Sequence, residues 1–399
     1  MSFSAAAMAH VSVHPALQPA AKPHQSASTS SASKSQQVRD GMLAKLHGQR
    51  VRIPDLGKMM EHWSKEMSPH VDMVDSKVLN MIENHAVNDA VRTRLTKAKL
   101  SEQLAGWYPF ASCDTMAALT SFQVWMFIVD DLLDQYSLPH KFDFAALHIL
   151  LTDCRDFIER SLGLGSAAAA APGPGAEHYS YRDHDAVTSF EEYAGVVMQT
   201  YGDSHAYRAR IAKEAIATLD GYRQEAMNRH EGRAPSLGEY LGYRAASSCI
   251  MQVVVNFEFA NGIHVPEDVM TTPEMCKLYE AAVAICYILN DVVSLRKEVK
   301  EGFVENLVVL LADGDVQKGV DGAAARMQRE VYALEEAAEG AARRFEGTEY
   351  KQDVATLIKN CKNMCRTSWL WSMRTPRYCL ADIVPDAEGG WIFTVDAMP

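Results

Sequence analysis

Three aspartates close a long apolar segment of this sequence. Asp130, Asp131 and Asp134 follow residues 116–129, in which apolar side chains recur at the three- and four-residue spacing of a buried helix. On a helix, Asp130 and Asp134 lie about 40° apart, and Asp131 lies within roughly 100° of both. Carboxylates this close raise each other's pKa unless a cation lies between them. The motif D-D-x-x-D therefore predicts a site for a hard divalent ion such as Mg²⁺; the alternative is a solvated helix end with surplus acid.

A second stripe of oxygen ligands follows another apolar helix, predicted to begin at Thr272. Asn290, Ser294 and Glu298 stand at i, i+4 and i+8, a drift of only about 80° around a helix. An amide oxygen, a hydroxyl and a carboxylate on one stripe form an all-oxygen ligand set for a hard cation. The alternative is a polar stripe that faces water. Because the stripe continues the line of an apolar face, we favour the metal site.

Taken together, these motifs resemble those of a known family. The pair D-D-x-x-D and N-D-x-x-S-x-x-K-E is similar to the two metal motifs of class I terpene cyclases, especially the fungal and bacterial sesquiterpene cyclases. Two further matches agree with the resemblance. Arg244 stands 46 residues before Asn290, and the pair Arg377-Tyr378 begins 87 residues after it. The resemblance extends from about Arg52 to Tyr378, nearly the whole of the segment expected to fold.

The resemblance implies a single all-α domain, a class I terpene synthase-like helical barrel or bundle with a deep apolar cavity. In that family the two motifs face each other across the mouth of the barrel and bind three Mg²⁺ ions, which Mn²⁺ could replace, together with the substrate diphosphate. The implied metal residues are Asp130, Asp131, Asp134, Asn290, Ser294 and Glu298, of which Asp131 and Asp134 could instead support the ligands or accept hydrogen bonds from closing arginines. The implied diphosphate-binding residues are Arg244, Lys297, Arg377 and Tyr378.

The resemblance also implies residues that act on the carbocation, besides Asp130 and Arg244. Phe127 lies one turn deeper than Asp130 on the same helix face, with Gln123 a further turn below. Trp371 stands six residues before Arg377, where the family has an aromatic residue. Ser248 matches the family's effector position at a helix break, although many bacterial members have glycine there. The alternative for Phe127 and Trp371 is that both are ordinary core residues.

Composition limits the partners of this protein. The 399 residues are 48% hydrophobic and 23% charged, as in a soluble globular protein. The net charge of −12 argues against nucleic acid or an anionic membrane surface as the main partner. No apolar run reaches the roughly 18 residues that span a bilayer, so we expect no stable membrane insertion. The eight cysteines include no C-x-x-C pair, which predicts free thiols and a cytoplasmic location. A monomer or a homodimer is expected.

The domain boundaries follow from changes in composition. Residues 1–48 are rich in Ser, Ala, Gln and His and predict a disordered N-terminal extension. Residues 49–381 predict the helical domain, with a surface loop of Ala, Gly and Pro near 163–180. Residues 382–399 are expected to form a C-terminal tail.

Three helix starts carry recognisable signals. Ser189 with Glu192, and Ser236 with Glu239, have the spacing of a capping box. Thr272 precedes a proline and an acidic residue, which is typical of a helix N-terminus.

The predicted function is Mg²⁺-dependent ionisation of a prenyl diphosphate, farnesyl diphosphate being the leading candidate, followed by cyclisation to a sesquiterpene hydrocarbon or alcohol and release of diphosphate. A monoterpene or diterpene cyclase acting on a shorter or longer substrate is one alternative. A prenyl diphosphate synthase is another, but those enzymes carry a second Asp-rich motif where this chain has Asn290, Ser294 and Glu298. A non-catalytic helical binding protein is disfavoured because unused buried carboxylates would be costly.

Overall fold

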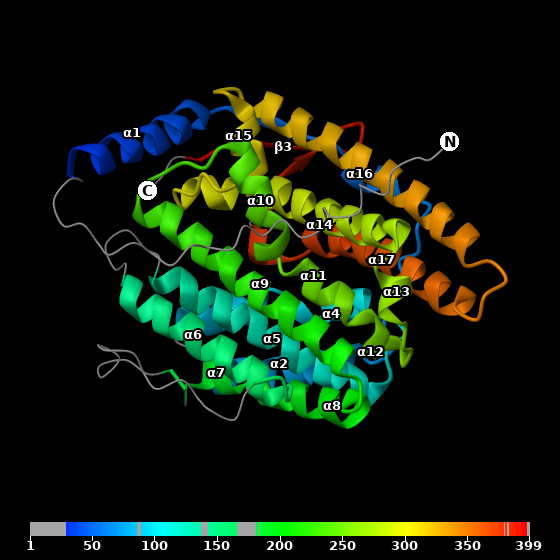
Figure 1. The fold of residues 1–399 in the computed structure, drawn as a ribbon. Coiled ribbons are helices and arrows are strands. Elements are labelled where there is room, and N and C mark those ends of the chain that lie inside the picture. Colours follow the sequence, from blue (N-terminus) through cyan, green and yellow to red (C-terminus); the bar gives the residue numbers. More distant parts are fainter. Residues whose placement is uncertain are drawn as a thin grey trace, which may run out of the picture.

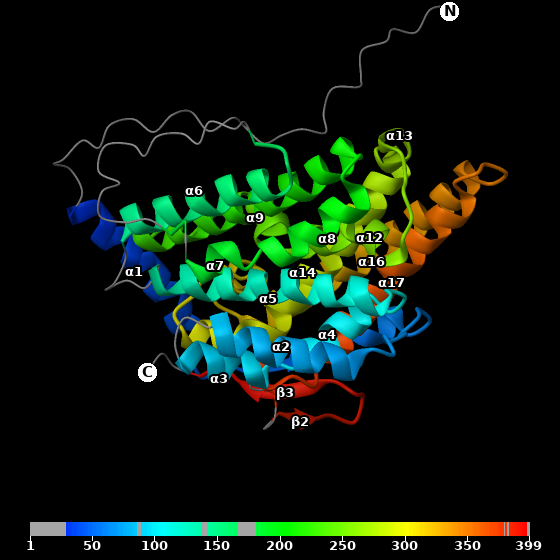
Figure 2. The same ribbon diagram turned by 90° about the horizontal axis from the view of Figure 1, so that it is seen from below.

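Helices account for most of the chain, and a small sheet lies at one edge (Figures 1 and 2). The computed structural model describes residues 29–85, 89–136, 143–165, 181–182, 184–378, 380 and 383–396. The side chains of Asp131 and Asp134 lie outside this description, as do residues 166–180 of the predicted surface loop. The all-α fold class expected from the sequence is confirmed.

The helices of the described chain have the following bounds: α1 Thr29–Leu46, α2 Val71–His85, α3 Asp89–Lys97, α4 Leu100–Trp107, α5 Cys113–Tyr136, α6 Phe144–Ser161, α7 Asp185–Thr188, α8 Glu191–Tyr201, α9 His205–His230, α10 Leu237–Ser247, α11 Ile250–Val255, α12 Phe257–Asn261, α13 Glu267–Met270, α14 Pro273–Lys300, α15 Leu307–Ala312, α16 Val316–Arg344 and α17 Lys351–Ser372. Two short 3₁₀ helices cover Leu56–Met60 and Pro376–Tyr378, and the strands are β1 Arg50–Ile53, β2 Val384–Pro385 and β3 Trp391–Thr394.

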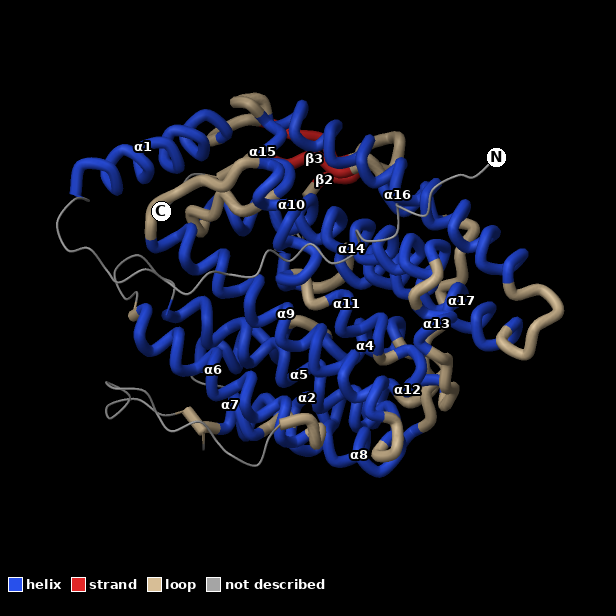
Figure 3. The backbone as a smooth tube through the Cα atoms, viewed as in Figure 1, coloured by secondary structure: helices blue, strands red, loops and turns tan. Residues whose placement is uncertain are grey.

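The centre of the fold is α14, which packs against α10, α11, α16 and α17 (Figures 1 and 3). Its side chains are buried on nearly every face, from Met275 to Leu295, which explains why it is apolar all round. By length and composition α14 could cross a membrane, but 89% of its most apolar 18-residue segment is buried inside the protein. Its apolarity therefore follows from its position in the core.

Two of the predicted helix starts are confirmed. Ser236 and Glu239 form the complete capping box of α10, in which each side chain accepts a hydrogen bond from the other residue's backbone N–H. Helix α14 begins at Pro273, as the sequence predicted. The hydroxyl of Thr272 does not cap the helix, however, because it donates to the carbonyl of Val269.

The capping box predicted at Ser189 is wrong. Helix α8 begins at Glu191, and its N-cap residue is Phe190, whose side chain makes no capping hydrogen bond. The carboxylate of Glu192 is instead held between helices, where it accepts hydrogen bonds from Lys77 on α2 and Ser121 on α5. Tertiary partners therefore outcompete the local cap.

The prediction of disorder through residue 48 is wrong for residues 29–46, which form α1. Leu43 and Leu46 are buried against the core. Arg39 makes two hydrogen bonds to the carboxylate of Glu305, at 2.5 and 3.1 Å, and both side chains are almost fully enclosed. A few tertiary contacts thus order a segment whose composition is that of a flexible chain. Residues 1–28 lie outside the described part.

The prediction of a separate C-terminal tail is also wrong for the described residues of that segment. Strands β2 and β3 pair antiparallel with each other, and β3 pairs with β1 in the order β1-β3-β2 (Figure 2). Arg50 faces Thr394 and Ile53 faces Trp391 in this register. The ends of the helical domain are therefore joined by a sheet that is too short for strand periodicity to reveal in the sequence.

Candidate active site

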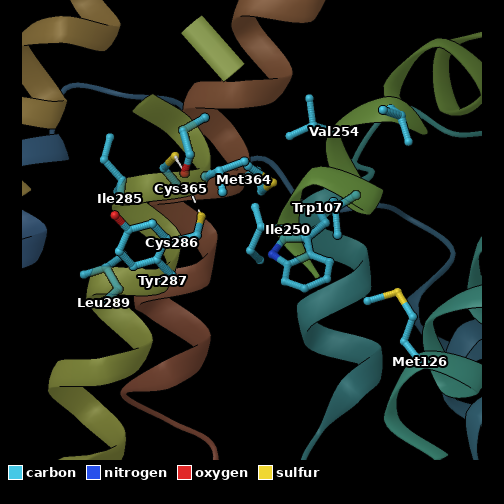
Figure 4. Close-up of a cluster of buried hydrophobic side chains, with 14 of the residues drawn as sticks. Trp107, Met126, Ile250, Val254, Ile285, Cys286, Tyr287, Leu289, Met364 and Cys365 are labelled. Carbon is cyan, nitrogen blue, oxygen red and sulfur yellow. Dashed lines mark hydrogen bonds between the residues drawn. The ribbon is translucent and has the colours of Figure 1, made fainter. Parts of the chain in front are cut away.

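One deep cavity lies between α4, α5, α9, α10, α11, α14 and α17. It holds about 1290 Å³ of empty space, counting its open mouth. Its mouth is charged and its depth is apolar. Cys286, Tyr287 and Leu289 of α14 line the cavity together with Trp107 of α4 and Ile250 of α11, and Figure 4 shows Ile250 and Trp107 between Cys286 on one side and Met126 of α5 on the other. The cavity thus combines a polar entrance with a hydrocarbon-like interior.

Asp130 of the first predicted metal motif and all three residues of the second open onto this cavity. Asp130 reaches it from α5, while Asn290, Ser294 and Glu298 reach it from α14. The Asp130 side chain is 31% exposed, which places it at the entrance. Side-chain oxygens from both predicted motifs, distant in sequence, are therefore brought to one space.

Arg244 of α10 is bound directly to the second motif. Its Nη2 donates to Asn290 Oδ1 at 2.7 Å, and its Nε and Nη2 donate to Asp291 Oδ1 at 3.1 and 2.7 Å. Burial lowers the pKa of the guanidinium, but the charges of Asp291, Tyr240, Glu225 and Glu298 together outweigh this effect, so the net pKa lies well above its usual value. Arg244 consequently stays charged at the rim of the cavity.

Asp291 is a residue whose importance the sequence reasoning missed. It is fully buried, and besides Arg244 it accepts hydrogen bonds from the hydroxyl of Tyr240 and from the backbone N–H of Leu307 at 2.9 Å. It therefore joins α10, α14 and the start of α15. The available signal was its place beside Asn290 in the motif, about 60° around the helix from the centre of the ligand stripe.

Asn306 holds two residues of the second motif in place through hydrogen bonds, and the sequence analysis did not identify it. Its Nδ2 donates to Glu298 Oε2 at 2.9 Å and to the backbone carbonyl of Asp291 at 2.7 Å. Its Oδ1 caps α15. Burial, followed by the nearby charge of Asp291, raises the pKa of Glu298. The carboxylate of Glu298 is thus oriented by an amide while its charge is disfavoured, and a bound cation would offset this cost.

The residues at this site fit a hard divalent ion. Ser294 Oγ is enclosed and has no hydrogen-bond partner in the described part of the chain, although hydroxyls so placed are normally bonded. Among the described residues, no three His, Cys, Asp or Glu side chains cluster as a metal site. A metal held here would therefore use amide and hydroxyl oxygens beside the carboxylates, a donor set that suits Mg²⁺.

The Arg377-Tyr378 pair links the two sides of the mouth. The Arg377 guanidinium carbon lies 5.1 Å from the Phe127 ring centroid, and Nη2 is 3.9 Å from Asp130 Oδ2. The hydroxyl of Tyr378 accepts a hydrogen bond of 2.9 Å from Asn290 Nδ2. Burial raises the pKa of this phenol, so it remains a neutral donor. The pair thus touches both metal motifs.

Lys297 and Trp371 also line the cavity. Lys297 Nζ lies 3.5 Å from Glu301 one turn further along α14, in an ion pair that is open to solvent. The indole N–H of Trp371 is shared between the carbonyls of Ala98 and Lys99, at 3.0 and 2.9 Å. Trp371 is therefore held rigidly in the wall, whereas the ammonium of Lys297 is able to change partners.

The helix break expected near Ser248 is present. Helix α10 ends at Ser247, Cys249 has a φ of 63°, and α11 begins at Ile250. Both serines line the cavity. The break is tightly packed against α9, because a Cβ at Gly221 would lie only 2.8 Å from the backbone nitrogen of Ser247. Glycine is thus required for this approach.

Glu225 of α9 fixes the same break from the cavity side. Its Oε1 accepts a hydrogen bond of 2.5 Å from the Ser247 hydroxyl, and its Oε2 lies 3.4 Å from Arg229 Nη2. Burial raises the pKa of Glu225, although the charges of Arg229 and Arg244 oppose this effect. Ser248 itself donates to the carbonyl of Ala245. The backbone around the break is therefore ordered by a carboxylate that the sequence did not indicate.

Comparisons with known proteins agree with this geometry. Residues 121–331 match the family model described as terpene synthase family 2, C-terminal metal binding. Sesquiterpene cyclase hepA of Aspergillus oryzae is 24% identical over 360 residues, covering 88% of this chain and 95% of that protein. Two solved structures have a similar fold. Linalool/nerolidol synthase from Streptomyces clavuligerus has a TM-score of 0.61 at 18% identity, covering 78% of this chain and 98% of that one. Hedycaryol synthase has a TM-score of 0.59 at 17% identity, covering 78% and 95%.

The family match and the helical fold together define a terpene synthase. This chain belongs to terpene synthase family 2, and it is a terpene cyclase that uses a metal cofactor.

Proposed function

We propose that the protein ionises farnesyl diphosphate in the presence of Mg²⁺ and cyclises the resulting carbocation to a sesquiterpene. The observation that carries this proposal is the single cavity onto which Asp130 and the stripe Asn290, Ser294 and Glu298 both open, above an apolar interior. Sesquiterpenes contain fifteen carbon atoms, so the similarity to sesquiterpene cyclase hepA of Aspergillus oryzae supports a fifteen-carbon substrate.

In this proposal, Asp130 holds Mg²⁺ on one side of the mouth, with Asp131 and Asp134 completing that motif, and Asn290, Ser294 and Glu298 hold it on the other side. We expect three ions, as the family resemblance implies. When bound, the metal supplies positive charge that neutralises the departing diphosphate.

The cationic and hydroxyl groups at the mouth would bind the diphosphate oxygens. Arg244, Lys297, Arg377 and Tyr378 all line the cavity there. Arginine offers a planar set of donors and tyrosine a single directed hydroxyl. Their bonds to a leaving group strengthen as its charge develops, and this preference for the transition state is what accelerates ionisation. Because they come from α10, α14 and the segment after α17, binding would draw these elements together over the substrate.

The experiment that tests this function is an assay of purified protein with farnesyl diphosphate and Mg²⁺. We expect a volatile sesquiterpene by gas chromatography, released diphosphate in equal amount, and loss of both on addition of a chelator. Geranyl and geranylgeranyl diphosphates serve as shorter and longer comparison substrates. Diphosphate release without any terpene, or a product only with isopentenyl diphosphate present, would contradict cyclisation.

The aromatic walls give a prediction on product distribution. Phe127→Ala and Trp371→Ala are each expected to change the product mixture more than the rate of diphosphate release, because a ring facing a dry cation contributes about 0.5–2 kcal/mol. The measurement is product analysis beside a diphosphate assay. Phe122→Ala is the matched control, since Phe122 is buried on the same helix but does not line the cavity. Equal product changes in the control would show that loosened packing is responsible.

A further inference from the structure

Two glutamine side chains in the cavity wall lack the partners that buried amides normally have. Gln103 of α4 is 6% exposed and Gln123 of α5 is 1% exposed, and both line the cavity. The Oε1 atom of each accepts no hydrogen bond from any residue that the structure describes. A buried amide oxygen left without a partner costs about 1–3 kcal/mol, so such groups are rarely retained without a ligand.

The neighbours of these amides are apolar. Trp107 follows Gln103 by one turn of α4, and Met126 follows Gln123 by about one turn of α5, and both line the same cavity (Figure 4). Helices α4 and α5 pack directly against each other. A half-turn of an amide about its terminal bond exchanges oxygen and nitrogen, so each group can present its oxygen to the cavity.

The chemistry of the substrate limits which groups could donate a hydrogen bond to these amide oxygens. A terpenyl chain contains only carbon and hydrogen, so it offers no hydrogen-bond donor. The diphosphate belongs at the charged mouth, beside Arg244 and Arg377. Within the apolar depth, the remaining donors are the O–H groups of water and of an alcohol product. A water molecule is held in a protein interior when at least two polar partners are available, and two amides that line one cavity would supply them.

We propose that Gln103 and Gln123 hold a water molecule in the cavity, and that this water attacks the final carbocation so that the main product is a sesquiterpene alcohol. The proposal rests on the proposed function. It assigns to these glutamines a role that neither metal motif supplies, which is the choice between hydration and loss of a proton.

The chemical step balances without any further reactant. Water that donates both hydrogens to the two amide oxygens keeps a lone pair directed away from them. That lone pair forms a C–O bond to the cationic carbon. The resulting oxonium ion loses one proton by way of the amide oxygen that holds it, and the diphosphate released in the ionisation step is the final acceptor, which leaves a neutral alcohol and a protonated diphosphate.

The test is product analysis in water enriched with the heavy oxygen isotope. For the unaltered protein, with farnesyl diphosphate and Mg²⁺, we expect an alcohol that carries the heavy isotope. Gln123→Leu should lower the ratio of alcohol to hydrocarbon by about tenfold, equivalent to the loss of one buried hydrogen bond. Gln103→Leu should act in the same direction, and diphosphate release should continue in both.

Gln252→Leu is the matched control. Gln252 of α11 is 1% exposed, and both of its amide atoms lack a partner within the described part of the chain, but it does not line the cavity. We expect its product ratio to be unchanged. A second measurement is independent of turnover: a crystal structure of the substrate-free protein should show an ordered water between the two cavity amides, and this water should be missing from the Gln123→Leu variant.

The outcomes separate the two proposals. A hydrocarbon without heavy oxygen as the main product of the unaltered protein would overturn the water proposal while leaving the cyclase function intact. An alcohol whose ratio survives both cavity substitutions would also overturn it. Absence of both terpene and diphosphate release would contradict the proposed function instead, and the crystal structures would then decide whether the amides bind water.

Discussion

Asp130→Asn is expected to lower kcat/KM for farnesyl diphosphate by about a thousandfold or more, with the helical content unchanged. Asparagine keeps the size of the side chain but removes its charge, and one metal-binding oxygen becomes an amide nitrogen. Loss of a group that stabilises developing charge costs on the order of 3–4 kcal/mol in the transition state. Because Asp130 is 31% exposed at the cavity mouth and its ion pair with Arg377 is long, at 3.9 Å, we expect the substitution to leave the fold intact.

The measurement for Asp130 is steady-state kinetics over a range of Mg²⁺ concentrations, with circular dichroism to monitor the fold. Asp114→Asn serves as the control, since Asp114 is exposed in the first turn of the same helix, α5, away from the cavity. We expect normal kinetics for this control. Retention of even a tenth of the activity by Asp130→Asn would rule out a ligand role for Asp130.

The sequence predicted the parts of the site that lie on regular helices. Asn290, Ser294 and Glu298 follow one another at four-residue intervals, so their common face could be derived from helix geometry alone. Arg244 could be placed only by its resemblance to a family position. In the structure its Nη2 lies 2.7 Å from Asn290 Oδ1, so the two residues are indeed brought together.

Contacts made between helices could not be predicted from periodicity. Asp291 and Asn306 act through bonds to residues on other elements, and no local pattern encodes those bonds. The prediction of disorder for the residues of helix α1 was wrong for a similar reason. Its composition is typical of disorder, and the buried pair of Arg39 with Glu305 joins positions that are 266 residues apart. Long-range pairs of this kind cannot be predicted from a single sequence.

Asp291→Asn is expected to cause the largest loss of stability among the site variants, about 3–5 kcal/mol, together with a large loss of turnover. The carboxylate of Asp291 is fully buried and accepts hydrogen bonds from Arg244, Tyr240 and the backbone of Leu307. An asparagine amide would turn N–H groups toward at least one of these donors and leave the guanidinium charge without its counterion. Denaturant unfolding followed by circular dichroism measures the loss.

Two comparison variants separate the charge from the hydrogen bonds. Tyr240→Phe removes one neutral donor and leaves the ion pair in place, so a loss of only about 1–2 kcal/mol is expected, with most of the turnover retained. Asp396→Asn removes the partner of Arg296 at a surface site, where the Asp396 side chain is 41% exposed, and should cost less than about 1 kcal/mol.

The double variant Arg244→Met with Asp291→Asn decides whether the two residues act as one unit. Arg244→Met alone strands a buried carboxylate, so adding Asp291→Asn removes the stranded charge and should restore part of the lost stability. Turnover should not return, because the guanidinium that would bind diphosphate is still missing. Stability losses that simply add would show that Asp291 does not hold Arg244 in place. Recovery of turnover would show that Arg244 serves the fold and not the substrate.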